Sequence, residues 1–294
     1  MDGLLIVDKP SGMSSHDVVS CVRKVFGERS VGHLGTLDPL ATGVLPLLLG
    51  RYTRLAQYFG QSDKEYAGTL RFGFATDTYD VEGTPVGEPQ AVTLDASWLE
   101  AAVDSMRGVI QQMPPIYSAK KVNGVPAHRL ARKGQTPELR AVEIRVDQFE
   151  AEILSPDEVS FHVTVSSGGY VRCLAHELGQ RLGCGAHLTT LRRLRAGEFA
   201  LDRATTLTSL EASAAPEELL VPAAYVLAGM PALLVDDTSA VRLKNGMQIN
   251  LPDFSSAPLL RILHPRDRIF AIGKRMAGTL FAPQTFRCLN FVES

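Results

Sequence analysis

The sequence predicts an α+β protein of two domains: a larger N-terminal domain of interspersed strands and helices, and a small β-rich C-terminal domain. The chain has 294 residues, more than the roughly 150 that a single domain usually holds. Apolar residues follow strand and helix periods in turn as far as about residue 200, whereas short strand-like segments recur from residue 233 onward. We therefore place the two domains at residues 1–230 and 231–294.

The N-terminal domain begins with a strand and a capped helix. Residues 4–7 are all apolar, which predicts a buried strand. Ser14 and Asp17 match a helix N-cap with an acid three residues later, and apolar residues recur at the helical period up to residue 26. Further along the domain, the periodicities predict a strand at 66–74, a helix at 96–106, paired strands at 149–154 and 159–165, a helix from about 170 to 182, and a helix and connection at 212–231.

The C-terminal domain is predicted from short strands and a turn. The sequence Lys-Asn-Gly at residues 244–246 is a turn signal. Strands are expected at 233–235, 247–251, 259–263, 268–272 and 279–281. This spacing indicates a small β-barrel-like module.

Composition and hydropathy exclude several classes of protein. Hydrophobic residues make up 45% of the chain and charged residues 21%, as in ordinary soluble globular proteins. The longest apolar run, residues 44–49, contains Pro46 and is much shorter than the ~18 residues of a membrane-spanning helix. Because Met1 leads directly into the first strand without a basic segment, we expect a cytoplasmic protein with no membrane partner.

The cysteine and histidine pattern argues against a metal site. The four cysteines are widely separated and form no Cys-x-x-Cys pair, so neither a zinc site nor a disulfide framework is predicted. His176 and Glu177 resemble the start of a zinc-protease helix, but the residue four positions after His176 is Gln180 instead of a second histidine. We therefore expect no bound metal ion.

Charge is segregated along the chain, although the net charge is only −2. Residues 76–104 contain seven acidic residues and no lysine or arginine, whereas residues 118–145 contain seven basic and two acidic residues. Basic residues also dominate 260–290 and the short segment 192–195. One such cluster usually forms a solvated surface, but three of them favour a path that binds the phosphates of a nucleic acid.

The most informative motif is the loop Gly-His-Leu-Gly-Thr-Leu-Asp-Pro-Leu-Ala-Thr-Gly at residues 32–43. Its glycines permit backbone angles closed to other residues, and Pro39 disfavours a helical conformation at Asp38. The loop therefore directs one carboxylate. An aspartate before a proline among glycines is also typical of an ordinary turn, so local chemistry alone leaves both interpretations open.

The complete string resembles the catalytic loop of the TruB family, the bacterial tRNA pseudouridine-55 synthases. Four other segments resemble further motifs of this family: 7–12, 64–66, 169–172 and 183–193. The resemblance extends over nearly the first 205 residues, and residues 243–246 are a looser match to the PUA-type RNA-binding module that follows the catalytic domain. It implies a pseudouridine-synthase catalytic domain of the α+β class, built on a mixed or antiparallel sheet with helices, and a PUA-like C-terminal domain.

The resemblance assigns catalysis to three residues: Asp38 as the covalent catalyst, Tyr66 and Arg172. A guanidinium stays charged, so Arg172 is suited to keep Asp38 ionised in a dry pocket. Tyr66 offers a ring to stack on the target base and a phenolic oxygen near C5, with a structural core tyrosine as the alternative. Three routes remain open for the carboxylate: capture of the sugar at C1′, addition to C6 of the base, and a glycal route after proton removal at C2′.

The resemblance also assigns substrate-binding residues. His33 is expected to stack in the tRNA loop where the target uridine leaves it, because a base inside a folded loop must be flipped out to be reached. Tyr170 and Leu191 are expected to wall the uracil pocket. Lys9 and Pro10 are grouped with the substrate-binding residues and are expected to support the catalytic loop.

The basic segment 117–145 resembles the thumb insertion of the family, which closes over the T-arm of tRNA. Glycines and prolines interrupt its helical character. Its apolar residues are suited to pack on exposed bases, and phosphate contacts are expected from Lys120, Lys121, Arg132 and Lys133.

These observations predict an isomerase that converts uridine 55 in the T-loop of tRNA to pseudouridine. The reaction involves no net oxidation, so no cofactor is expected. We expect tRNA as the partner, with no guide RNA and no obligate protein partner, and a monomeric protein. One alternative is a non-catalytic tRNA-binding or chaperone protein, which the intact Asp38, Tyr66 and Arg172 disfavour. The other is a guide-RNA-directed synthase, which the small C-terminal module disfavours.

Overall fold

The structure, a computed structural model, describes the chain except for residues 61, 119, 123, 132, 136, 246, 248, 251–255, 265–267, 277–284 and 292–294. Within helices and strands, the side chains of residues 121, 126, 128, 250, 268, 270, 276 and 285–291 also lie outside the description. The predicted strand at 279–281 therefore falls outside the described residues.

The larger sheet is mixed, as predicted. Its ten strands are β1 (Gly3–Lys9), β2 (Val31–His33), β3 (Thr42–Leu49), β4 (Lys64–Phe72), β7 (Gly108–Gln112), β10 (Val142–Ser155), β11 (Glu158–Val165), β12 (Ala186–Ala196), β13 (Phe199–Ala200) and β14 (Thr205–Thr206). They lie in the order β14-β1-β3-β12-β4-β11-β10-β7, with β2 beside β3 and β13 beside β12. The pairs β1–β14 and β3–β12 are parallel, and the other neighbours are antiparallel.

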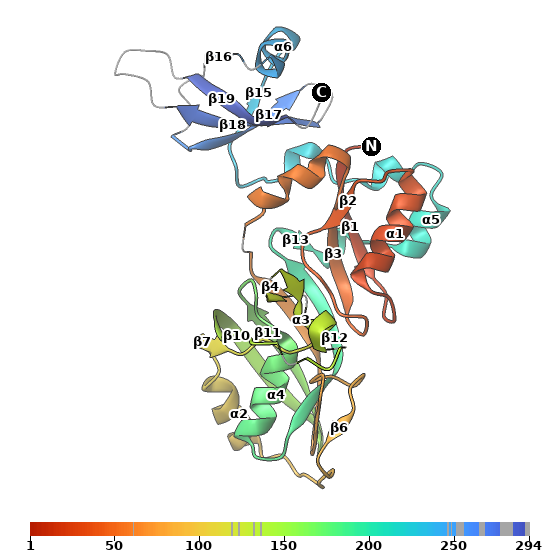
Figure 1. Ribbon diagram of the computed structural model, residues 1–294, viewed down its shortest axis with the longest axis vertical. Coiled ribbons are helices and arrows are strands. Elements are labelled where there is room, and N and C mark those ends of the chain that lie inside the picture. Colours follow the sequence, from red (N-terminus) through yellow and green to blue (C-terminus); the bar gives the residue numbers. More distant parts are fainter. Residues whose placement is uncertain are drawn as a thin grey trace.

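Four helices contribute to one core with this sheet (Figure 1). α1 (Ser15–Phe26) and α5 (Leu207–Ala212) lie near β1 and β3, and α2 (Ala96–Asp104) and α4 (Val171–Arg181) lie near the other half of the sheet. The core includes Val18, Leu99, Leu174 and Leu210, one from each helix, because the apolar stripe of each helix faces the strands. The predicted capping box at the start of α1 is present.

Two central strands, β3 and β12, have no counterpart among the elements that periodicity predicts. β3 contains Pro46, which has no N–H to donate to a neighbouring strand. One edge of β3 pairs with β1, whereas the other edge pairs with β12 at Thr42 and Gly43 and with β2 from Leu47 to Leu49. On this second edge, Pro46 lies between the segment paired with β12 and the segment paired with β2. An interior strand can therefore contain a proline at this position, because no strand partner there needs its N–H.

The short elements connect the sheet to its surroundings. β10 begins at Val142, seven residues before the predicted strand, so the end of the expected thumb belongs to the sheet. The described part of the thumb contains β8 (Lys121–Val122), β9 (Val125–Pro126) and α3 (Ala127–Ala131). The other short elements are β5 (Ala75–Thr76), β6 (Pro85–Val86), η1 (Gly50–Tyr58), η2 (Leu201–Arg203), η3 (Pro216–Leu219) and η4 (Ala223–Tyr225).

A second sheet of five strands forms the C-terminal part of the molecule, at one end of its long axis (Figure 1). Its strands are β15 (Ala232–Leu234), β16 (Ile249–Asn250), β17 (Leu259–His264), β18 (Arg268–Met276) and β19 (Thr285–Phe291), in the order β15-β17-β18-β19-β16. The sequence pattern did not indicate β19 or the helix α6 (Asp237–Lys244) in this part.

The two sheets are joined by an apolar cluster and by hydrogen bonds. Tyr52, Val226, Ile269 and Ile272 belong to one buried cluster with residues of both parts. The backbone N–H of Ile269 donates to the hydroxyl of Tyr52 at 2.9 Å. The C-terminal part therefore shares core contacts with the N-terminal part. In the described part of the chain, no helix is long and apolar enough to cross a membrane.

Candidate active site

A cavity of about 560 Å³ lies where the Asp38 loop, the start of the thumb and the N-terminus of α4 meet. The segments that line it are distant in sequence and come together through the order of the central strands. They comprise residues 35–39, Lys64, Tyr66, Thr78, Asp80, Glu82, residues 117–118, residues 167–172, Leu191 and Arg193.

Asp38 lies in the connection from β2 to β3. Hydrogen bonds from residues near the N-terminus of the chain hold this loop. The hydroxyl of Ser15, at the start of α1, donates to the carbonyl of Leu37 at 2.9 Å and accepts from its N–H at 2.8 Å. The N–H of Gly12 donates to the carbonyl of Pro39 at 2.9 Å. The Asp38 side chain retains 36% exposure, and the residue lines the cavity. The backbone of this loop is thus anchored while the carboxylate stays accessible.

Lys9 supports the loop from inside the protein. It is fully buried, and its ammonium donates to the carbonyls of Pro10, Met13 and Pro39 at 2.8, 2.5 and 3.2 Å. Burial lowers the pKa of Lys9 to about 8, although Asp38 partly opposes this shift. Lys9 and Pro10 are absent from the lining of this cavity, and the contacts of Lys9 are those expected of a residue that supports the loop.

Arg193 is a second buried cation beneath the loop. Its guanidinium donates to the carbonyls of Val44 at 2.7 Å, Gly35 at 3.1 Å and Thr36 at 3.3 Å. The backbone of Arg193 also passes so close to Gly43, where φ is +99°, that a side chain at position 43 would meet its carbonyl oxygen. β12 therefore fixes both ends of the loop through one arginine.

The basic segments of the sequence are not all available to phosphates. Arg192 forms an ion pair with Asp8 at 2.8 Å, and Arg195 forms one with Glu65 at 3.0 Å. Arg261, from the basic stretch near the C-terminus, is buried and donates to the backbone carbonyls of Ala224, Val226 and Met230. Internal partners thus hold buried Arg261, whereas Arg192 and Arg195 remain 39% and 37% exposed in their ion pairs, so their part in a phosphate path stays a prediction.

Arg172 extends from the first turn of α4 into the cavity wall and is only 5% exposed. Its Nε lies 2.8 Å from Oδ2 of Asp38. Its Nη1 donates to the carbonyl of Thr78 at 2.9 Å and lies 3.5 Å from Oδ2 of Asp80, and its Nη2 donates to the carbonyl of Tyr117 at 3.0 Å. The structure thus brings Asp38 and Arg172 together, but through a single nitrogen and not through a bidentate pair.

Asp80 also lines this cavity, and the sequence pattern did not single it out, because it lies in an acidic stretch interpreted only through its charge. It is 3% exposed, and its Oδ1 accepts from the hydroxyl of Thr78 at 2.6 Å and from the N–H of Glu82 at 3.1 Å. Burial raises the pKa of Asp38, Arg172 lowers it and Asp80 raises it. The pKa of Glu82 is raised by burial and by both aspartates. Three carboxylates therefore share this cavity with two buried arginines, Arg172 and Arg193, of which Arg172 pairs with Asp38.

The expected pocket walls also meet at this cavity. Tyr66 on β4 and Leu191 on β12 are each 7% exposed, and their strands are direct neighbours in the sheet. Tyr170 precedes α4, and the Gln112 side chain donates to its carbonyl at 3.1 Å and accepts from its N–H at 2.8 Å. Burial raises the pKa of Tyr170. Rigid elements thus hold an aromatic ring and an aliphatic side chain in the wall of a carboxylate-bearing pocket.

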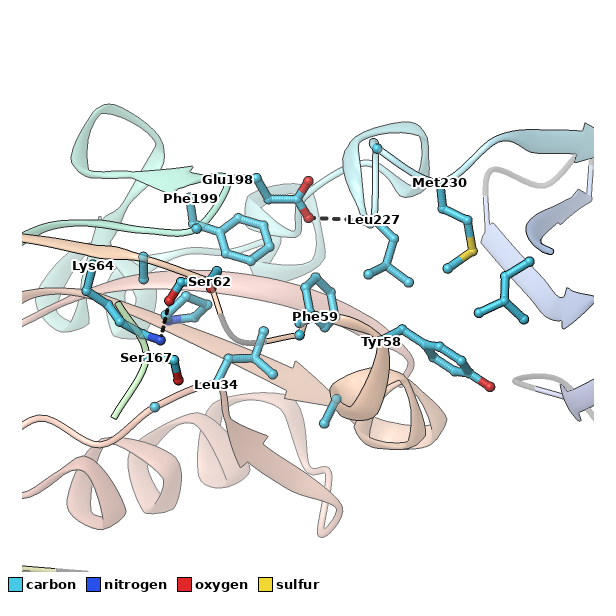
Figure 2. Close-up of a pocket in the computed structure, with 18 of the residues that line it drawn as sticks. Leu34, Tyr58, Phe59, Ser62, Lys64, Ser167, Glu198, Phe199, Leu227 and Met230 are labelled. Carbon is cyan, nitrogen blue, oxygen red and sulfur yellow. Dashed lines mark hydrogen bonds between the residues drawn. The ribbon is translucent and has the colours of Figure 1, made fainter. Parts of the chain in front are cut away.

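His33 lines a larger neighbouring cavity of about 760 Å³ at the junction with the C-terminal part. The two cavities share Gly35, Lys64 and Ser167. Figure 2 shows Lys64 and Ser167 at one end of the junction cavity, Met230 at the other and Phe59 between them. Burial lowers the pKa of His33.

The thumb residues are only partly described. The ammonium of Lys120 lies 3.4 Å from the carbonyl of Arg140, to which it donates, and Lys133 is exposed. Arg132 and the side chain of Lys121 lie outside the described residues. In the part of the chain that is described, no group of His, Cys, Asp and Glu side chains is arranged to hold a metal ion.

Comparisons with known proteins identify the family of the chain. Residues 23–171 match the model of the TruB family pseudouridylate synthase N-terminal domain, and residues 172–228 match that of the tRNA pseudouridylate synthase B C-terminal domain. The tRNA pseudouridine synthase B of Solibacter usitatus is 44% identical over 289 residues, which cover 96% of this chain and 99% of the relative. The enzyme of the same name from Thermobifida fusca is 42% identical and covers 95% and 96% of the two chains.

A solved structure shares the fold. A chain of a Cbf5-Nop10-Gar1 complex superimposes with a TM-score of 0.70 at 25% identity, over 99% of this chain and 85% of that one. The family models together span residues 23–228, and the curated relatives match over nearly the whole chain. The chain therefore belongs to the TruB family of pseudouridine synthases.

Proposed function

We propose that this enzyme converts uridine 55 in the T-loop of tRNA to pseudouridine, with Asp38 as the catalytic carboxylate. The observation that carries the proposal is the accessible Asp38 carboxylate, which is ion-paired with buried Arg172 in a cavity that Tyr66 also lines. The names of the curated relatives supply the class of RNA.

The reaction breaks the N1–C1′ glycosidic bond and joins C5 to C1′ after the uracil has turned. The proton on C5 leaves, and N1 takes up a proton, so no electrons are gained or lost. Asp38 acts in its ionised form by capture of C1′, by addition to C6 or in a glycal route. Arg172 stabilises that form, because its charge opposes the effect of burial on the pKa of Asp38.

The other cavity residues bind the base. Tyr66 stacks on the uracil and brings its phenolic oxygen near C5, where the proton leaves. Tyr170 and Leu191 enclose the ring. His33, beside the cavity, stacks in the tRNA loop in the space that the flipped uridine vacates.

The RNA extends from the thumb across the active site and into the junction cavity. Lys64 lies at the border of the two cavities, where a phosphate next to the flipped nucleotide would pass. Aromatic residues of the junction cavity offer stacking faces to the following base; these are Tyr58, Phe59 and Phe199. The C-terminal part acts as a PUA-like RNA-binding domain. The T-arm is bound by the thumb cations Lys120, Lys121, Arg132 and Lys133.

The enzyme acts alone, as a monomer, without guide RNA. The naming of the curated relatives for tRNA favours this over guided modification. Purified protein should therefore modify an unmodified tRNA transcript with no other component present. Activity that appears only when a second RNA or a protein is added would overturn this part of the proposal.

The test of the whole proposal uses tRNA labelled with tritium at C5 of uridine. Wild-type protein should release tritium from position 55 and leave a pseudouridine there, and a transcript with cytidine at position 55 should release none. Asp38→Asn should abolish turnover and keep the tRNA dissociation constant within about tenfold, because the phosphate contacts remain. Tight binding by the wild type without tritium release would instead support the non-catalytic alternative. Asp38→Asn activity above a few per cent of the parent would remove Asp38 from its role.

A further inference from the structure

A stacked pair of rings, Tyr79 and His176, lies next to the catalytic arginine but outside the lining of the catalytic cavity. Their ring centroids are 3.9 Å apart, and the ring planes differ by 17°. His176 lies on α4 one turn after Arg172, so both residues project from the same side of the helix. The mechanism proposed above uses neither ring.

Tyr79 has an unusual backbone conformation. Its φ is +67°, in the left-handed region, and among the described residues other than glycine only Leu227 shares a positive φ. This conformation is unfavourable for a residue with a Cβ, so it persists where surrounding contacts enforce it. The conformation of Tyr79 therefore depends on the contacts that Tyr79 and its neighbours make.

Tyr79 separates the two residues that hold one nitrogen of Arg172. The carbonyl of Thr78 accepts from Nη1 of Arg172 at 2.9 Å, and Oδ2 of Asp80 lies 3.5 Å from the same atom. The left-handed turn at Tyr79 sets the relative direction of these two flanking groups. The carbonyl of Tyr79 itself accepts from the N–H of Leu188 at 3.0 Å, so the turn is also attached to β12. Relaxation of this turn would move both acceptors away from Arg172.

We propose that His176 is a positioning residue for pseudouridine synthesis. Its ring clamps Tyr79 in the left-handed conformation and thereby keeps Thr78 and Asp80 against Arg172, which holds Asp38. The inference rests on the function proposed above. α4 thus supplies both the catalytic guanidinium and, one turn later, the support for the loop that orients it.

The surroundings of His176 show that its ring face, and not its charge, makes the contact. Its Nδ1 is buried and has no hydrogen-bond partner in the described part of the chain. Burial lowers the pKa of His176, which favours the neutral ring. A cavity of about 490 Å³ borders both Tyr79 and His176, so a larger ring at position 176 has room. A phenylalanine is therefore a suitable replacement for the histidine.

The first experiment compares His176→Ala with His176→Phe in the full chain. We expect His176→Ala to lower the single-turnover rate at saturating tRNA by about tenfold, the upper range for one aromatic stacking contact. The dissociation constant for tRNA should stay within about twofold, since neither ring lines the cavity. His176→Phe should keep the parental rate within about twofold, because it restores the stack without the imidazole nitrogens.

The second experiment uses Tyr79 and remains informative if His176→Ala fails to fold. Tyr79→Ala loses the stack but keeps the strained conformation, whereas Tyr79→Gly loses the stack and adopts a positive φ without strain. We therefore expect Tyr79→Gly to be several-fold more active than Tyr79→Ala. In the Tyr79→Gly background, His176→Ala should have little further effect on the rate.

Three results would overturn the proposal. The first is a folded His176→Ala variant with a lower melting temperature and an unchanged single-turnover rate, which would reduce the stack to ordinary packing. The second is a folded but inactive His176→Phe variant, which would assign the role to the imidazole nitrogens. The third is equal activity of Tyr79→Ala and Tyr79→Gly. A wild-type protein that forms no pseudouridine would refute the proposed function instead, before any variant is compared.

Discussion

The replacement Arg172→Lys tests whether the active site needs a shaped cation or only a positive charge. The guanidinium presents three nitrogens in three directions, toward Asp38, toward Thr78 and Asp80, and toward Tyr117. A lysine ammonium concentrates its donors at one point on a flexible stem, so it cannot occupy all three positions. The variant keeps the charge and loses the geometry.

The size of the effect follows from these contacts. A hydrogen bond to a charged group contributes about 1.5–3 kcal/mol, and a lysine that reaches Asp38 gives up the contacts of at least one Nη. Loss of about 3 kcal/mol from the transition state lowers the rate by roughly 10². We therefore expect the single-turnover rate of Arg172→Lys to fall by about 10² or more, with tRNA affinity little changed.

Arg172→Met should be worse and should change the pH profile. Burial already raises the pKa of Asp38, and Arg172 is the largest influence in the opposite direction. Removal of the cation raises this pKa further, so a higher pH is needed to ionise the carboxylate. The rising limb of the pH–rate profile should move to higher pH, and part of the lost activity should return in alkaline buffer.

The assay measures single-turnover tritium release at saturating tRNA over a pH series, together with the dissociation constant. Arg71→Lys is a matched control, because Arg71 lies on β4 in an exposed ion pair with Asp157, and its rate should equal that of the parent. A parental rate for Arg172→Lys would show that a point charge suffices. Near-parental activity of Arg172→Met would show that the contact with Asp38 has no catalytic role.

Three further predictions concern the support of the loop and the binding of RNA. Lys9→Met should lower the free energy of unfolding by about 3 kcal/mol, because buried carbonyls lose their donor. The pKa of Lys9 falls from 10.5 to about 8 on folding, so the unfolded chain binds more protons between these values. In urea titrations, the stability gap between parent and variant should therefore widen as the pH rises from 8 toward 10.5; a constant gap would show that folding does not lower the pKa of Lys9. Joint replacement of the thumb cations Lys120, Lys121, Arg132 and Lys133 by methionine should weaken tRNA binding and flatten its salt dependence by about 0.7–0.9 per lost phosphate contact. An unchanged slope would place the RNA elsewhere. A chain that ends at residue 231 should melt at a lower temperature and bind tRNA more weakly, because Tyr52 and Val226 lose their C-terminal neighbours. Its single-turnover rate at saturation should survive while it is folded, since the described residues that line the catalytic cavity all lie at or before position 193.

Local sequence signals predicted the elements whose structure is decided by nearby residues. The capping box of Ser14 and Asp17 is complete, and the strand that carries Tyr66 lies close to its predicted position. The strands β3 and β12 were not predicted, because Pro46 argues against a strand and the arginines of β12 interrupt its apolar residues. An alternating pattern was present there, since Leu191 and Arg193 are both buried two residues apart.

Asp38 was predictable from the sequence, because the glycines and the proline that direct its carboxylate lie in the same motif, residues 32–43. Asp80 was not, because its role depends on contact with Arg172, a residue 92 positions later in the chain, and an acidic stretch carries no sign of such a partner. The same limit applies to Tyr79, whose left-handed backbone is seen only in the folded loop.

The role of a charged residue is hardest to predict from the sequence where the fold buries that residue. Lys9 and Arg193 each donate to three backbone carbonyls, and these carbonyls lie in or beside the loop that carries Asp38. Buried carbonyls need donors, and here side chains with several donors supply them from β1 and β12. The two cations therefore fix the loop backbone, whereas Arg172 forms the ion pair with the Asp38 carboxylate. We therefore expect a shaped guanidinium to be required there, because the same group also contacts Thr78, Asp80 and Tyr117.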